Sequence, residues 1–102
     1  MNSKFYGLLG ICTKAGAVAS GAFAAEKTIK DGKAFLVIVA NEASEGTKSD
    51  YEKLCNGYKT ELRIFGTKDE LGKAVGKEER TVVAITDEGL SKSLLKLMTL
   101  ED

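Results

Sequence analysis

The segment Ser20–Ala40, SGAFAAEKTIKDGKAFLVIVA, combines the pattern of a short helix with that of a buried strand. Because a helix has 3.6 residues per turn, Ala22, Ala25 and Ile29 fall on one apolar side of it. The uninterrupted apolar run at Ala34–Ala40 is typical of a strand that is covered on both faces. A helix that leads directly into such a strand indicates an α/β fold.

Helical and strand patterns alternate along the rest of the chain. We predict helices at 3–14, 21–31, 47–58 and 67–76 and from about Asp87 onward, and strands at 17–19, 34–40, 62–65 and 81–86. The apolar side of the third helix is expected to carry Tyr51, Leu54, Cys55 and Tyr58. The architecture that follows is a three-layer α-β-α sandwich around a small mixed sheet. The loops before the second and third helices and after the fourth are expected to gather at one of its ends.

Composition places the chain in the class of small globular proteins. Its 102 residues are enough for one domain, which we take as 1–102. An apolar run long enough to span a membrane is absent from the sequence, and the apolar residues near the N-terminus follow a helical period, so we expect a cytoplasmic protein. Cys12 and Cys55 fall on separate predicted helices, which favours buried, reduced thiols over a disulfide.

Several classes of catalytic and metal site find no support in the sequence. Histidine is absent, which removes the commonest general base near neutral pH and the commonest zinc ligand. The Ser93–Lys96 segment matches S-x-x-K without its companion motifs, and the Gly72–Lys77 segment is one residue short of a phosphate-binding loop. Adjacent acidic residues diverge on a helix and do not share a ligand. We therefore expect no enzyme, no metal and no cofactor.

The start of the second helix is the strongest candidate site. Phe23, Lys27 and Lys30 lie at i, i+4 and i+7 and share a face. Ser20 is expected to cap the helix, and the free N–H groups beside Gly21 favour a phosphate. The chain has no net charge, but residues 1–40 carry five lysines and two acidic residues, a net charge of +3. A basic patch on a neutral protein fits selective binding of nucleic acid better than indiscriminate binding.

The order of motifs resembles a known family. LLGICTKAGAVASGAFAAEKTIKDGKAFLVIVANEAS at 8–44 and LGKAVGKEERTVVAITDEGLSKSLLKLM at 71–98 are closely similar to bacterial members of the ribosomal-protein L-seven-Ae / L-thirty-e family. The resemblance implies a compact α-β-α fold that binds structured RNA, often kink-turns with tandem sheared G·A pairs. It also implies that the start of the second helix enters the widened groove of the RNA.

The resemblance assigns roles residue by residue. Gly21 and Lys27 match the family's glycine and its lysine that meets the RNA backbone, whereas Phe23 and Ala24 replace an Asn-Glu pair that reads the sheared purines. Neither replacement can form a base-edge hydrogen bond, although Phe23 is able to stack on an extruded base. The resemblance also places other polar residues in RNA-facing loops, namely Asn41, Glu42, Ser44, Lys68, Lys77 and Arg80.

Three functional hypotheses remain at this point. The first is a non-enzymatic RNA-binding protein that recognises kink-turn-like RNA, including ribosomal RNA, in a ribosome or translation context through Ser20–Ala24, Lys27, Lys30 and the flanking loops. The second is a protein-interaction module that keeps the fold and uses Phe23 as an apolar anchor. The third is an RNA-holding subunit for a separate RNA-modifying enzyme.

Overall fold

The computed structural model describes residues 3–100. The helices are α1 (Ser3–Lys14), α2 (Ala22–Lys30), α3 (Glu45–Gly57), α4 (Lys68–Ala74) and α5 (Glu88–Leu100). The strands are β1 (Val18–Ser20), β2 (Leu36–Val39), β3 (Glu61–Ile64) and β4 (Val82–Ile85). Each predicted helix and strand is confirmed in type and order, and the ends differ from the prediction by one or two residues at most positions.

The strands form a mixed sheet in the order β1-β4-β2-β3. β4 runs antiparallel to both β1 and β2, whereas β2 and β3 are parallel and place Ile38 opposite Arg63. Ile38 also lies opposite Val83 of β4. β1 lies at one edge of the sheet, as the sequence predicts for the short segment before α2.

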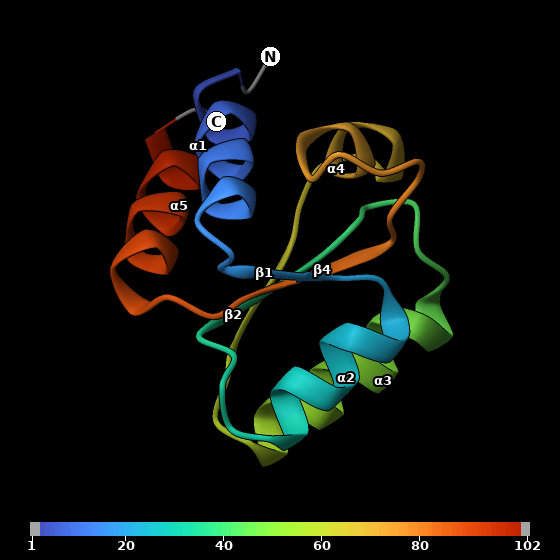
Figure 1. Cartoon of the computed structure of the whole chain (residues 1–102). Helices are drawn as coiled ribbons and strands as arrows, with labels where there is room; N and C mark the ends of the chain where they lie inside the picture. The colour runs from blue at the N-terminus through green and yellow to red at the C-terminus, as the bar shows by residue number, and fades with distance from the viewer. Residues whose placement is uncertain (1–2, 101–102) are drawn as a thin grey trace.

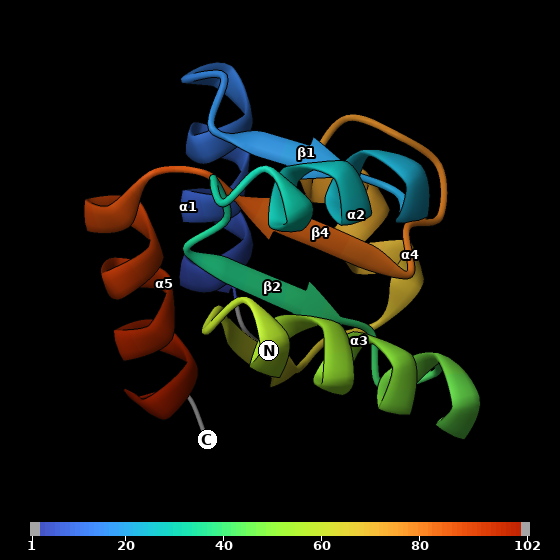
Figure 2. The same ribbon diagram turned by 90° about the horizontal axis from the view of Figure 1, so that it is seen from below.

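Helices cover both faces of this sheet. Figure 1 shows α1, α4 and α5 on one side and α2 and α3 on the other, and Figure 2 shows α2 and α3 lying beside one another across the sheet. Successive strand residues point to opposite faces, so Leu36 and Ile38 of β2 join the core under α1 and α5, whereas Val37 and Val39 join the core under α2 and α3. The predicted α-β-α sandwich around a small mixed sheet is therefore confirmed.

Three apolar residues that the sequence pattern predicts to be buried are exposed in the structure. Ala22, the first residue of α2, is exposed. Tyr58 is 48% exposed because it is the residue that caps the C-terminus of α3, beyond the buried Tyr51 and Cys55. Phe35 is 44% exposed because β2 begins only at the next residue.

The two cysteines are buried on opposite faces of the sheet, and neither is paired. Burial raises the pKa of the Cys55 thiol to about 11 and also raises the pKa of Cys12, near which the Asp87 carboxylate adds to the effect. The prediction of buried, reduced thiols is confirmed. Among the helices of residues 3–100, none has the length and apolar character needed to span a membrane.

Candidate nucleic-acid interface

An open groove of about 650 Å³ lies at the end of the sheet where β1 leads into α2 and the chain enters β4. Three separate segments line it: Ser20–Ala24 at the start of α2, the pair Thr47 and Tyr51 of α3, and residues 79–82 before and within β4. The segments before α2 and after α4 meet at this groove as expected, whereas α3 contributes residues of the helix itself and not of the loop that precedes it. Five of the predicted site residues line the groove in one run, and Arg80 faces them from the third segment.

Gly21 makes the turn from β1 into α2. Its backbone has φ 93° and ψ 160°, a conformation that is accessible essentially only to glycine. Its N–H donates to the carbonyl of Val82 at 2.9 Å, and its carbonyl accepts from the N–H of Ala25 at 2.9 Å. The prediction of Ser20 as the cap of α2 is wrong, because Ser20 is still in β1, where it pairs with Val83, and Gly21 takes the cap position.

The outer face of α2 carries the predicted aromatic and cationic residues. Phe23 is 86% exposed and, with Lys27 and Lys30, lines a shallow depression next to the groove. The ammonium group of Lys27 lies 3.0 Å from a carboxylate oxygen of Asp31, one turn further along. The prediction that Phe23, Lys27 and Lys30 share a face is confirmed.

Tyr51 connects α3 to the first turns of α2. Its hydroxyl lies 3.4 Å from Oε2 of Glu26 and 3.5 Å from the carbonyl oxygen of Ala22. Burial, reinforced by the nearby Glu26 carboxylate, raises the pKa of Tyr51 to about 12, so the hydroxyl remains a proton donor at neutral pH. Sequence reasoning places Tyr51 only in the core, since the reach of its hydroxyl to α2 depends on how the two helices pack.

Arg80 lies near Gly21 in the groove. A Cβ at residue 21 would be 3.8 Å from Arg80 Nε. One terminal nitrogen of the guanidinium donates to the carbonyl of Glu79 at 2.8 Å, whereas the buried Nε has no hydrogen-bond partner within residues 3–100. The exposed Lys77 belongs to the same loop but is not among the residues that line the groove.

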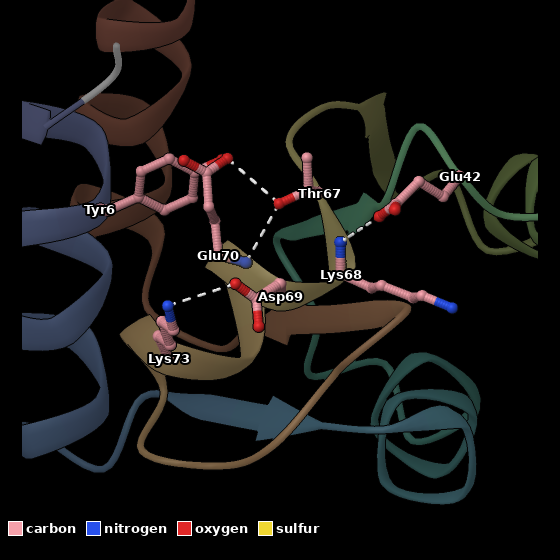
Figure 3. A network of polar contacts seen from close by, with 7 residues as sticks. All are labelled: Tyr6, Glu42, Thr67, Lys68, Asp69, Glu70 and Lys73. Carbon is pink, nitrogen blue, oxygen red and sulfur yellow. Dashed lines mark hydrogen bonds and ion pairs between the residues drawn. The ribbon is translucent and has the colours of Figure 1, made fainter.

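The polar residues that follow β2 have partners inside the protein. Asn41 donates from its backbone N–H, at 2.8 Å, and from Nδ2, at 3.3 Å, to the carbonyl of Gly66. Oε1 of Glu42 accepts from the backbone N–H of Lys68 at 2.6 Å (Figure 3). Ser44 caps α3 by accepting from the N–H of Thr47 at 3.1 Å. Because Ser44 is the cap, α3 begins at Glu45, two residues before the predicted Thr47.

The charge around the groove is mixed. Ion pairs join Lys27 to Asp31 at 3.0 Å, Lys68 to Glu79 at 3.7 Å and Lys48 to Glu45 at 3.6 Å. Through residues 3–100, no three histidine, cysteine, aspartate or glutamate side chains lie close enough together to hold a metal ion. The arrangement offers an exposed aromatic ring, several cations and polar backbone groups, which are the elements of a surface for a polyanion with unstacked bases.

Comparison with known proteins identifies similar chains. The protein is 35% identical over 95 residues to the RNA-binding protein YlxQ of Bacillus subtilis, covering 93% of this chain and 95% of that protein. It is 30% identical to the RNA-binding protein YlxQ of Enterococcus faecium, covering 93% and 91% of the two chains.

Solved structures show the same fold. A protein from Bacillus halodurans superposes with a TM-score of 0.89 at 31% identity, covering 94% of this chain and 97% of that one. The 15.5kD RNA binding protein of Giardia lamblia superposes with a TM-score of 0.78 at 23% identity, covering 97% and 86%, a likeness that extends to the fold alone. The model of one protein family matches residues 3–95. The chain belongs to the Ribosomal protein L7Ae/L30e/S12e/Gadd45 family.

Proposed function

We propose that this protein is a single-domain, non-enzymatic RNA-binding protein that recognises a bent, kink-turn-like RNA in a ribosomal or translational context in the cytoplasm. Membership of the L7Ae/L30e/S12e/Gadd45 family and the name RNA-binding protein YlxQ of two relatives support binding to RNA. The observation that carries the proposal is the position of Phe23, Lys27 and Lys30 beside the groove at the start of α2.

The proposed contacts divide into two kinds. Phe23 stacks on an unpaired base, since its ring is 86% exposed and has no hydrogen-bonding group. Lys27 and Lys30 contact phosphates along the same face, and Arg80 contacts the RNA from the opposite wall of the groove. Gly21, Ala22 and Ala24 leave room for the RNA backbone to approach. Such contacts position the RNA without reading base edges, so discrimination rests on RNA shape.

The flanking loops contribute a second set of cations. Lys68 begins α4, where its carbonyl accepts from the N–H of Arg80, and Lys77 lies in the loop that leads to Arg80 and β4. In this proposal they contact phosphates beyond the kink. The polar side chains of Asn41 and Ser44 already have partners in the protein, so their contacts to RNA are expected to add to those hydrogen bonds.

Titration against two RNAs tests the function. Labelled kink-turn RNA and a matched uninterrupted duplex are each titrated with the protein at two salt concentrations. With ~3–5 phosphate contacts, the log–log slope of affinity against salt is expected to be about −0.7 to −0.9 per contact. Preferential, salt-dependent binding to the kinked RNA is the expected result. Equal binding to both RNAs, or binding to neither, would refute the recognition of kinked RNA.

A second candidate function rests on the exposure of Phe23. A large apolar side chain that is 86% exposed on a neutral protein also suits an anchor for a partner protein. This candidate predicts that affinity for the partner protein depends on Phe23 but responds little to salt, because a contact centred on an apolar ring releases few counterions.

A further inference from the structure

Lys68, the first residue of α4, is hydrogen-bonded through its backbone to two different loops. Its N–H donates to Oε1 of Glu42, which follows β2, at 2.6 Å. Its carbonyl accepts from the N–H of Arg80, just before β4, at 2.9 Å. Figure 3 shows the Glu42 carboxylate reaching across to the Lys68 nitrogen. One residue thus connects the end of β2 to the wall of the groove.

The neighbouring residues strengthen this connection. The carbonyl of Gly66 accepts from the N–H of Asn41 at 2.8 Å, and the N–H of Ala40 donates to the carbonyl of Thr81 at 2.8 Å. The ammonium group of Lys68 lies 3.7 Å from Glu79. Three loops that are distant in the sequence are therefore joined beside Arg80, whose side chain lies near Gly21.

The sign of the Glu42 charge is unfavourable for a surface that binds RNA. A carboxylate repels phosphates. Glu42 is exposed, so burial does not oblige its carboxylate to form a hydrogen bond within the protein. Its short hydrogen bond to a backbone N–H at the start of a helix is of the charge-assisted kind, which is stronger than a bond between neutral groups. The Glu42 carboxylate thus binds the backbone of Lys68 within the protein.

We propose that Glu42 is a positioning residue: its carboxylate holds the Lys68 backbone, and Lys68 in turn holds the Arg80 segment in the position that binds RNA. This inference rests on the proposed function, and it assigns to Glu42 a role in the protein in place of a contact to the RNA. Removal of the carboxylate frees the start of α4, and the Arg80 wall then moves away from Gly21.

Three variants test the proposal. Glu42→Ala removes the acceptor, whereas Glu42→Gln keeps an oxygen that accepts from the Lys68 N–H. Glu45→Ala is the matched control, since it removes a charge from the first turn of α3, where the side chain is 94% exposed and lies 3.6 Å from the ammonium group of Lys48. The measurements are affinity for the kinked RNA, thermal unfolding, hydrogen exchange of the Lys68 amide and the NMR shift of the Arg80 amide.

The expected result has a definite pattern. Glu42→Ala weakens RNA binding by about tenfold, roughly 1.4 kcal/mol, while Glu42→Gln stays within about twofold of the natural protein. Glu42→Ala also speeds exchange at Lys68 and shifts the Arg80 amide, whereas Glu45→Ala does neither and binds RNA at least as well as the natural protein. Glu42→Ala also lowers the midpoint of thermal unfolding modestly, because it removes a charge-assisted hydrogen bond at the start of α4.

Other outcomes overturn the proposal. Unchanged RNA binding by Glu42→Ala would show that the carboxylate does not position the binding surface, and tighter binding would show that it acts only by repelling phosphates. Equal losses in Glu42→Ala and Glu42→Gln, with unchanged Lys68 and Arg80 amides, would show a direct contact to the RNA. The amide measurements need no RNA, so they test the positioning of Arg80 even if the protein does not bind the kinked RNA.

Discussion

The backbone carbonyl of Glu78 packs directly on Gly72 of α4, so closely that a Cβ at residue 72 would lie 1.6 Å from the carbonyl oxygen. The N–H of Lys77 also donates to the carbonyl of Gly72 at 2.8 Å. The loop that carries Arg80 to the groove therefore runs over the surface of α4 at a point where only glycine fits. Gly72 has a structural role, and the incomplete phosphate-loop pattern around it is explained by packing.

Gly72→Ala is expected to destabilise the protein by about 3 kcal/mol, because the new methyl group meets backbone that cannot move aside without displacing the loop. The measurement is the free energy of unfolding from urea denaturation. Gly7→Ala in α1 is the matched control: a Cβ there meets no atom within 4 Å, so a gain of about 0.5–1 kcal/mol from helix propensity is expected. Equal effects of the two substitutions would contradict the close approach of Glu78 to α4.

The double substitution Lys27→Glu, Lys30→Glu is expected to weaken binding to kinked RNA at least about a hundredfold, since it replaces the two proposed phosphate contacts with repulsive charges. Its midpoint of thermal unfolding should hardly change, because the Lys27 side chain is 67% exposed and its ion pair with Asp31 contributes little to stability. Lys92→Glu, Lys96→Glu on α5 is the control and should bind normally. Full affinity in the α2 variant would place the site elsewhere.

Phe23→Ala is expected to weaken RNA binding by about 1–3 kcal/mol, the usual contribution of one base stacked on an aromatic ring. The slope of affinity against salt should stay the same, because no charge is altered. Phe35→Ala is the control: Phe35 is also exposed, but it lies at the opposite end of β2, where its N–H bonds to Ile85. Undiminished RNA binding by Phe23→Ala, measured by titration, would rule out stacking on this ring.

The protein should lose stability as the pH rises from about 10 toward about 12. Burial, followed by the neighbouring carboxylates Glu26 and Glu70, raises the pKa of Tyr51 and of Tyr6 to about 12 from the ordinary value near 10. The unfolded chain therefore loses these protons first, and deprotonation favours unfolding over that range. The measurement is urea denaturation at several alkaline pH values. Tyr51→Phe should show a shallower loss, and an identical slope would contradict the burial of this hydroxyl.

The regular parts of the fold were predictable from local patterns. The apolar run of β2 predicts a strand buried on both faces, and Leu36–Val39 are fully buried. Thr67 followed by Glu70 predicts the start of α4, and Thr67 Oγ1 accepts from the Glu70 N–H at 3.1 Å. Such signals depend on residues a few positions apart, so the sequence shows them directly.

The errors arose where tertiary pairing decides the outcome. Ser20 has the chemistry of a helix cap, but its pairing with Val83 extends β1 by one residue and moves the cap to Gly21. The periodicity of α3 continues through Tyr58, although the helix has ended there. The bond from Glu42 to Lys68 joins residues 26 positions apart, and no local pattern indicates it.

The most direct test of the central claim, that the groove at the start of α2 is the RNA-binding surface, is a map of backbone amide NMR shifts during titration with kink-turn RNA. The account predicts the largest changes at Gly21–Ala24, Lys27, Lys30 and Arg80, with little change along α1 and α5. Shifts that concentrate on α1 and α5, on the other side of the sheet, would contradict it.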